Sequence, residues 1–194
     1  MESKPVRAHT GRKRNDAAKQ AILRAVPSLL AAADRIDVTM SEIAAAACVG
    51  KQTIYRWWPS RGALLLDAMS EWASGAVPEP RTGNRRDDVA AFLRATFAAA
   101  STPPADALLR AILADAQRDR QVADQLAEFV AVRRNALAAI LARDGANPDD
   151  VELLVDQAFG VLWYRLSVTR APLSGKLADR LADSLCAAPA SGNP

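Results

Sequence analysis

The chain has 194 residues, half of them apolar, which is enough for one sizeable helical domain or for a small module joined to a larger one. Its net charge of +3 is unevenly divided, because residues 1–62 hold 11 Lys and Arg against 5 Asp and Glu, whereas residues 63–194 hold 14 against 17. No run of about 20 residues is apolar and free of charge, and the polar N-terminus lacks the apolar core of a signal peptide, so the composition argues against a membrane protein and favours a cytoplasmic one.

The first 15 residues are predicted to form a mobile basic arm, because they carry five Lys and Arg and almost nothing to bury. A basic segment attached to a mildly acidic body is typical of a protein that brings one end to DNA phosphates. A solubilising basic tail would have the same composition, so charge alone leaves both interpretations open.

The rest of the chain favours helix nearly throughout, because Ala and Leu dominate, Gly is sparse and β-branched runs are missing. The first helix is expected from about Asp16 to Ala33. Pro27 within it removes the amide that would bond to Leu23, so we predict a kink or a local break at that point.

The segment from Val38 to Leu64 predicts two short helices around a tight turn. Thr39, followed three residues later by Glu42, forms a capping box that starts the first of them. The turn is expected at residues 48–50, and the second helix at about residues 51–58.

Six more helices begin at residues of capping type, two of them followed directly by proline. Their first residues are Ser60, Asn84, Thr102-Pro103, Asp119, Asn147-Pro148 and Ser174. The last two are expected to extend to about Arg170 and Ala188. The total is nine helices, and the predicted fold class is all-α.

The second helix of the short pair is suited to the major groove of DNA. At 100° per residue its polar and apolar side chains separate onto two faces. The polar face holds Lys51, Gln52, Tyr55 and Arg56, and the opposite face holds Ile54 and Trp58. Gln can pair with adenine and Arg or Lys with guanine, while neighbouring donors hold phosphates. Helix-turn-helix pairs also occur in plain bundles, so spacing alone leaves DNA binding open.

In residue order and type, this segment resembles the DNA-binding domain of the tetracycline-repressor (TetR) family. The resemblance rests on the stretches VTMSEIA and KQTIYRWWPSRGALL. The first matches the family's threonine and isoleucine-alanine helix, and the second matches its lysine, its Thr-Ile/Leu-Tyr core and its basic residue before Ala-Leu. The resemblance covers about residues 15–65. The chain departs from the pattern with Asp34-Arg35 in place of Gly-aromatic, where Ile36 is expected to take over the packing. Cys48 stands in place of the turn glycine, and Gly50 in place of a serine cap.

The resemblance implies roles for individual residues and a DNA partner. Phosphate contacts are implied for Thr39, Lys51, Thr53, Tyr55, Trp57 and Arg61, and base reading for Gln52 and Arg56. A single helix-turn-helix makes too few base contacts for genomic specificity, so we expect a homodimer on a pseudo-palindromic operator in double-stranded DNA.

Two apolar stripes near the C-terminus are candidates for the dimer interface. They comprise Val151, Leu154, Val155 and Leu162 in one helix and Leu177 and Leu181 in the next. Such stripes suit a four-helix interface between subunits, although periodicity would equally fit packing inside one subunit. The resemblance favours the interface, since members of the family typically dimerise through their last two helices.

The resemblance also implies a small-molecule pocket among the central helices. The candidate lining residues are Trp72, Phe92, Phe129, Gln157, Trp163 and Tyr164, although the aromatic ones would equally serve as core. Gly160, which lies inside a helix beside aromatic residues, either admits a close helix neighbour or leaves room for a ligand.

The predicted function is therefore a homodimeric repressor that a small-molecule effector releases from its operator. A helical enzyme is disfavoured, because Cys48 and Cys186 lack metal-like spacing, His9 is the one histidine and there is no glycine-rich phosphate loop, so no catalytic residue, metal or cofactor is expected. An architectural DNA binder without an effector fits less well with so long a rear domain. The expected domains are a basic arm (1–15), a helix-turn-helix domain (16–62), a regulatory and dimerisation domain (63–188) and a tail (189–194).

Overall fold

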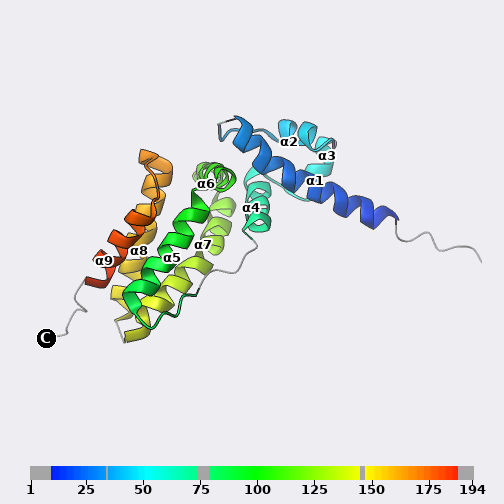
Figure 1. Cartoon of the computed structure of the whole chain (residues 1–194). Helices are drawn as coiled ribbons and strands as arrows, with labels where there is room; N and C mark the ends of the chain where they lie inside the picture. The colour runs from blue at the N-terminus through cyan, green and yellow to red at the C-terminus, as the bar shows by residue number, and fades with distance from the viewer. Residues whose placement is uncertain (1–9, 34, 74–78, 145–146, 188–194) are drawn as a thin grey trace, which may run out of the picture.

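Helices account for most of the backbone that the structure describes. The computed structural model describes residues 10–33, 35–73, 79–144 and 147–187. Within these ranges it contains nine α-helices and no strand, which confirms the all-α prediction (Figure 1). The helices are α1 (Thr10–Ala33), α2 (Met40–Ala46), α3 (Lys51–Tyr55), α4 (Arg61–Trp72), α5 (Arg85–Ala100), α6 (Pro103–Ala116), α7 (Arg120–Leu141), α8 (Pro148–Tyr164) and α9 (Gly175–Ala187).

The first three helices form an N-terminal module, residues 10–60, at one end of the molecule. Its interior is filled by buried side chains of α1, α2 and α3 that lie on the apolar stripes of those helices. These are Ile22, Val26, Leu30, Ile43 and Ile54. Helix α4 leads out of the module, and Figure 1 shows it descending toward the other helices.

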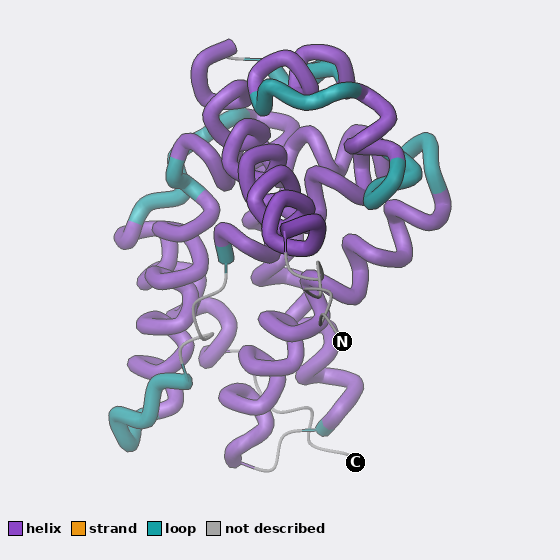
Figure 2. The backbone as a smooth tube through the Cα atoms, turned by 90° about the vertical axis from the view of Figure 1, so that its right-hand side faces the viewer, coloured by secondary structure: helices purple, strands orange, loops and turns teal. Residues whose placement is uncertain are grey.

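The remaining helices, α5 to α9, form a rear bundle, residues 85–187. Helix α5 packs mainly against α9, and α7 packs against both α5 and α8. Figure 1 shows α6 end-on, crossing the ends of its neighbours, and Figure 2 shows the same arrangement from the side. Because α6 contacts α1, α4 and α7, it is the element through which the bundle meets the N-terminal module.

Most helix starts follow the predicted caps. The Thr39 hydroxyl accepts from the Glu42 amide and the Glu42 carboxylate accepts from the Thr39 amide, so the capping box is confirmed. Side-chain caps are also present at Ser60, Asn84, Asp119, Asn147 and Ser174. Thr102 is the exception, because its hydroxyl donates to the Ala99 carbonyl (2.9 Å) and leaves the first turn of α6 without a side-chain cap.

Two helix boundaries near the N-terminus differ from the predictions. Helix α1 already begins at Thr10 and continues through Pro27, so of the predicted kink or local break the break is absent. The buried side chains of Leu23, Val26 and Leu30 hold both sides of the proline against the core. Helix α3 ends at Tyr55 instead of near residue 58, which lets the chain turn and bury the Trp58 ring.

A third difference lies at the end of α8. The α-helix stops at Tyr164, and residues 165–169 form a π-helical turn that ends at Arg170 in the left-handed region, with φ of 53°.

Among the described residues, no helix is long and apolar enough to cross a membrane.

Candidate nucleic-acid interface and apolar cavity

The turn between α2 and α3 has the geometry that its unusual residues imply. Cys48 has φ of 53°, the left-handed conformation in which the resemblance leads one to expect glycine. Gly50 is the N-cap of α3 with φ of −72°, a conformation open to any residue, and it provides no side-chain cap. The turn therefore has a strained cysteine and an uncapped helix where the TetR pattern has a glycine and a serine.

Helix α3 presents a polar face to solvent and an anchored face to the core. Lys51, Gln52, Tyr55 and Arg56 are exposed and Thr53 is half-buried, while Ile54 and Trp58 are buried, in agreement with the helical spacing. The exposed set combines two cations, an amide and a phenol hydroxyl, which are the groups that contact bases and phosphates in a major groove.

The anchor of this helix is the indole of Trp58. Its Nε1 donates to Asp67 Oδ2 on α4 (3.0 Å), and the same carboxylate oxygen lies 3.3 Å from the Lys19 ammonium on α1. Trp57 packs edge-on against Trp58, with 5.6 Å between ring centroids. The orientation of α3 is thus set by contacts with α1 and α4 together.

Three of the residues predicted to contact phosphate, Thr39, Trp57 and Arg61, lie apart from the exposed face of α3. Thr39 is exposed, but its hydroxyl belongs to the capping box, where the Thr39 amide and hydroxyl and then Arg35 lower the pKa of the Glu42 carboxyl. Trp57 is half-buried and lines a groove with side chains of α4 and α7. The prediction that its indole contacts phosphate stays a prediction, and the half-buried ring lies beside this groove.

Arg61 differs most from its expected role. Instead of facing solvent at the start of α4, its guanidinium forms an ion pair with Asp115 of α6 and donates to the carbonyls of Ile36 and Val38. Its side chain is only 20% exposed. The phosphate contact of Arg61 stays a prediction, and in the subunit its guanidinium is held by these interior acceptors.

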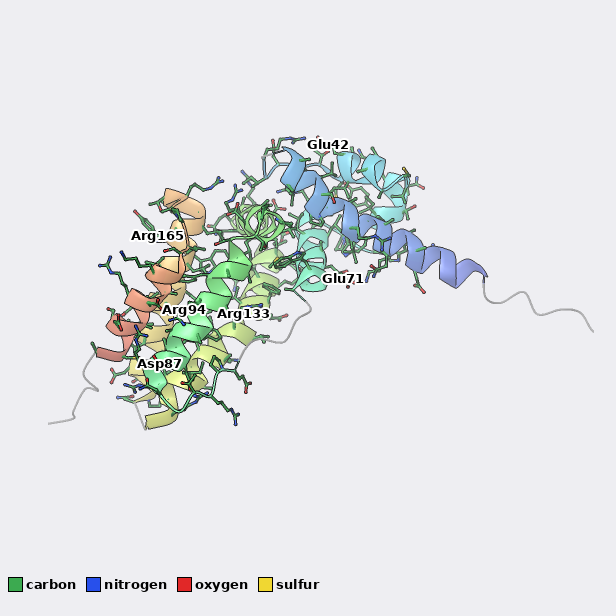
Figure 3. The ribbon with its side chains drawn as sticks, in the orientation of Figure 1. Glu42, Glu71, Asp87, Arg94, Arg133 and Arg165 are labelled. Atoms are coloured by element: carbon green, nitrogen blue, oxygen red, sulfur yellow. The ribbon has the colours of Figure 1, made fainter. Side chains whose placement is uncertain are left out.

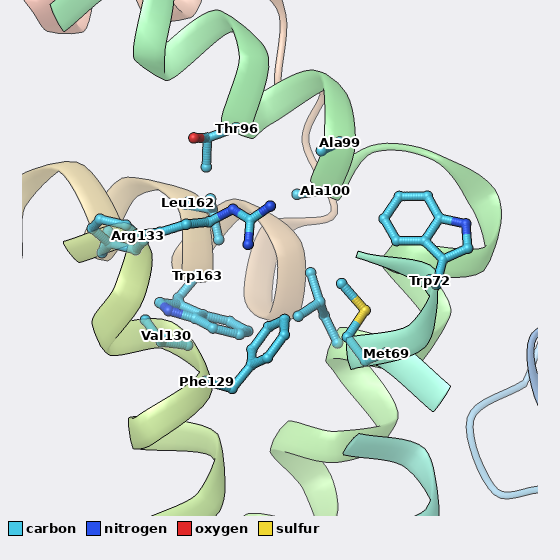
Figure 4. A pocket seen from close by; sticks show the side chains of 12 residues that line it. Met69, Trp72, Thr96, Ala99, Ala100, Phe129, Val130, Arg133, Leu162 and Trp163 are labelled. Atoms are coloured by element: carbon cyan, nitrogen blue, oxygen red, sulfur yellow. The ribbon is translucent and has the colours of Figure 1, made fainter. Parts of the chain in front are cut away.

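A small cavity of about 50 Å³ lies in the rear bundle, where α4, α5, α7 and α8 meet (Figure 4). Its lining is almost entirely apolar and aromatic, with Thr96 and Arg133 as the polar members. The lining residues are Met69, Trp72, Thr96, Ala99, Ala100, Leu109, Phe129, Val130, Arg133, Phe159, Leu162 and Trp163.

Three of the six predicted ligand-binding residues, Trp72, Phe129 and Trp163, meet at this cavity. The other three do not line it. Phe92 is fully buried in the core, whereas Gln157 and Tyr164 point outward from α8, because the inner face of that helix is taken by Ala158, Phe159 and Leu162. Ligand contacts by these three residues therefore stay predictions, and none of the three lines this cavity.

The predicted dimer stripe on α8 faces inward. Val151, Val155 and Leu162 are buried within the subunit, and Leu154, Leu177 and Leu181 are half-buried. The face of α8 opposite the buried stripe is exposed, and it continues into the π-helical turn. It consists of Leu153, Gln157, Gly160, Tyr164 and Val168. We call these five residues the outer face of α8.

Arg133 and Thr96 are cavity residues that the sequence predictions missed. The signal was present, because Arg133 falls on the otherwise apolar stripe of α7 formed by Leu126, Val130, Leu137 and Ile140. Figure 3 labels Arg133 on α7, and the residue is half-buried. Within the described ranges no cluster of His, Cys, Asp and Glu is arranged to hold a metal ion.

Comparisons with known proteins agree on one family. The model of bacterial regulatory proteins of the tetR family matches residues 29–68, and that of the tetracyclin repressor-like C-terminal domain matches residues 79–185. HTH-type transcriptional regulator YdeS of Bacillus subtilis (strain 168) is 28% identical over 165 residues, which are 82% of this chain and 83% of that protein. AqdR of Rhodococcus erythropolis, also an HTH-type transcriptional regulator, is 28% identical over 144 residues, 74% of this chain and 69% of that protein.

Solved structures show the same relationship. The TetR family transcription regulator SCO0332 is 32% identical and superposes with a TM-score of 0.65 over 87% of this chain and 96% of its own. The multidrug binding protein EbrR, solved with imidazole, is 17% identical with a TM-score of 0.62 over 89% of this chain and 97% of its own, and so shares the fold. One of the two matching family models covers α3 in the N-terminal module, and the other covers the rear bundle beside the cavity. The chain therefore belongs to the TetR family of helix-turn-helix transcriptional regulators.

Proposed function

We propose that the chain acts in the cytoplasm as a homodimeric repressor that binds a pseudo-palindromic operator and leaves it when a small molecule enters the rear bundle. The observation that carries the proposal is the face of α3, where Lys51, Gln52, Tyr55 and Arg56 are exposed while Ile54 and Trp58 are buried. A short helix fixed by its apolar side and polar on the other is the form that enters a major groove.

Base reading is assigned to Gln52 and Arg56, and phosphate contacts to Lys51, Thr53 and Tyr55. Thr39 stays in the proposed interface, because it is exposed at the start of α2. Arg61 and Trp57 are left out of it because their side chains are engaged inside the subunit.

The dimer is assigned to the outer face of α8. Leu153 and Tyr164 are 58% and 57% exposed, and Gly160 lies between them with nothing within 4 Å of where its Cβ would be. A glycine on such a face lets a second helix approach closely, and the large exposed side chains around it gain burial from that approach. Leu177 and Leu181 of α9, which are half-buried, border this interface in the proposal.

Release by an effector is assigned to the cavity because α4 lines the cavity at one end and packs against the N-terminal module at the other. Met69 and Trp72 line the cavity near the C-terminal end of α4, and Arg61 begins the same helix beside the N-terminal module. A molecule that enlarges the cavity displaces α4 and changes the separation of the two α3 helices, which must match half-sites about 34 Å apart. To convert a mostly bound population into a mostly released one, the effector must favour the released form by about 10⁴-fold.

The proposal is tested by selecting bound genomic fragments with the full-length protein. We expect one enriched sequence with two inverted half-sites, and loss of enrichment in a variant carrying Gln52→Ala and Arg56→Ala. Repeating the selection with a library of small molecules identifies effectors as those that abolish enrichment. Fragments without symmetry would contradict the dimer, and an unchanged result with the double variant would contradict the assignment of α3 as the reading helix.

A further inference from the structure

Arg133 carries a full positive charge into an otherwise apolar cavity. In Figure 4 its side chain reaches from α7 toward the middle of the lining residues, with Thr96 on one side and the rings of Phe129 and Trp163 on the other. In the part of the chain that the structure describes, its guanidinium has no carboxylate or carbonyl partner, and burial alone lowers its pKa. Because an arginine stays protonated at neutral pH even so, the charge is retained there.

Other arginines of the chain have carboxylate partners, and the neighbouring residue Arg134 is one of them. Arg134 forms ion pairs with Glu152 and with Asp156 (2.7 Å for the latter), and its guanidinium lies 5.7 Å from the centre of the Phe159 ring. Arg61 and Arg110, which are also partly buried, each face a carboxylate. A partly buried arginine without such a partner carries a cost in folding free energy.

A second polar group in the cavity lacks a partner as well. Thr96, on α5, is only 7% exposed, and its hydroxyl oxygen has no hydrogen-bond partner among the described residues. Buried hydroxyls in folded proteins are normally hydrogen-bonded. The cavity lining therefore holds one guanidinium without an ion-pair partner and one hydroxyl without a hydrogen-bond partner among the described residues.

The remaining lining residues determine the chemical character of the rest of the ligand. Apart from Arg133 and Thr96, the walls are aliphatic or aromatic, with Phe129, Phe159 and Trp163 on the bundle side. The cavity of about 50 Å³ is bordered by Trp72, whose side chain is 38% exposed at the end of α4. A cation would be repelled by Arg133, and a fully apolar molecule would leave the guanidinium unpaired.

We propose that this cavity binds an amphiphilic carboxylate, with Arg133 paired to the carboxylate, Thr96 hydrogen-bonded to the same head group and the apolar body against the aromatic walls. A guanidinium fork matches the two oxygens of a carboxylate in geometry and charge. The inference rests on the effector site proposed above and assigns its ligand class.

Decanoate and decanol serve as probes, because they share a chain and differ only in the head group. Each is titrated calorimetrically into the full-length protein at neutral pH in the absence of DNA. We expect decanoate to bind more tightly than decanol, and Arg133→Met to weaken decanoate binding by about 10- to 100-fold while changing decanol binding by less than about 2-fold. Arg133→Lys should retain part of the preference, because it keeps the charge without the fork.

Two controls keep this test decisive. Arg120→Met removes a cation from the same helix where the side chain is 91% exposed, and it should leave the binding of both probes unchanged. Arg133→Met should fold and should melt at a higher temperature than the parent without ligand, because it removes an unpaired charge from an apolar site. Decanoate should then raise the melting temperature of the parent more than that of the variant.

The inference is overturned if decanol binds as well as decanoate, if decanoate does not bind, or if Arg133→Met leaves decanoate affinity unchanged. These outcomes are independent of DNA. If decanoate binds through Arg133 without dissociating operator fragments, the ligand class stands and release by this ligand class fails. If another molecule dissociates the fragments while decanoate and decanol bind alike, the repressor function stands and the carboxylate assignment fails.

Discussion

Arg61 and Asp115 form a two-point ion pair between the first residue of α4 and α6, with Nε to Oδ2 at 2.9 Å and Nη2 to Oδ1 at 2.5 Å. The same guanidinium donates to the carbonyls of Ile36 (2.8 Å) and Val38 (3.1 Å). One side chain therefore joins the segment before α2, the start of α4 and the bundle. Because α4 also lines the cavity, this pair lies where the N-terminal module and the regulatory part are mechanically linked.

Asp115→Asn should weaken that link. The variant keeps the size of the side chain but leaves the partly buried Arg61 without its counter-charge, so we expect a loss of about 1–3 kcal/mol in the free energy of unfolding, measured with urea. Asp106→Asn is the matched control, because Asp106 pairs with Arg110 within α6 and makes no link to α4. Equal losses of unfolding free energy in the two variants would show that the Arg61–Asp115 ion pair stabilises the protein no more than the Asp106–Arg110 pair within one helix.

Gly62 and Val122 provide a second link between α4 and the bundle. A Cβ at Gly62 would lie 2.5 Å from Val122 Cγ2, so Gly62→Ala must push α4 away from the start of α7. We expect a destabilisation of about 1–3 kcal/mol from this overpacking. The variant Gly62→Ala with Val122→Ala should recover part of it, and a double-mutant cycle that is strictly additive would contradict a direct clash.

The capping and helix predictions succeeded because their causes are local. A cap needs a side chain within three residues of the amide it bonds, so Thr39 with Glu42, and Asn84 with Asp87, were visible in the sequence. The exposed face of α3 also followed from spacing along one helix. The TetR fold was recognisable for the same reason, since its motif occupies one continuous stretch.

The placements that the sequence did not reveal depend on which residues meet across the fold. Arg61 is separated from Asp115 by 54 positions, and nothing in the local pattern distinguishes this pair from a phosphate contact. On α8, periodicity identified an apolar stripe containing Val151, Val155 and Leu162, but a stripe at helical spacing has the same pattern whether it faces the core or a partner. Burial in the folded subunit separates the two faces of α8, because Leu153 and Tyr164 on the opposite side are 58% and 57% exposed.

Cys48→Gly should stabilise the protein. Cys48 is exposed and holds φ of 53°, where a Cβ atom costs about 1–2 kcal/mol and glycine has no such cost. Glycine also adds freedom to the unfolded chain, so we expect a net gain of about 1 kcal/mol or less, seen as a higher melting temperature. Cys48→Ala is the control for loss of the thiol, and it should not reproduce the gain.

Gly160→Arg should abolish the dimer without harming the subunit. A side chain at this position meets nothing within 4 Å in the subunit, so the fold tolerates it, whereas a helix packed closely over the outer face of α8 does not. Sedimentation should then show monomers with unchanged helicity, and cooperative binding to two half-sites should be lost. Lys176→Glu, a charge change on an exposed residue at the start of α9, is the control. A dimer that survives Gly160→Arg would place the interface elsewhere.

Lys51→Ala and Arg56→Ala should affect DNA binding in different ways. Both residues are exposed, so we expect each variant to keep its stability within about 0.5 kcal/mol. Losing a phosphate contact at Lys51 should weaken binding to all sequences alike and reduce the slope of log affinity against log salt by about 1. Losing a base contact at Arg56 should cost about 1–3 kcal/mol on the selected operator and relax the preference at one base pair of each half-site.

The measurement is fluorescence anisotropy over a salt series, on the operator and on every single-base change in one half-site. If Arg56→Ala lowers affinity equally for all of these sequences, Arg56 holds the backbone, and base reading falls to Gln52 alone.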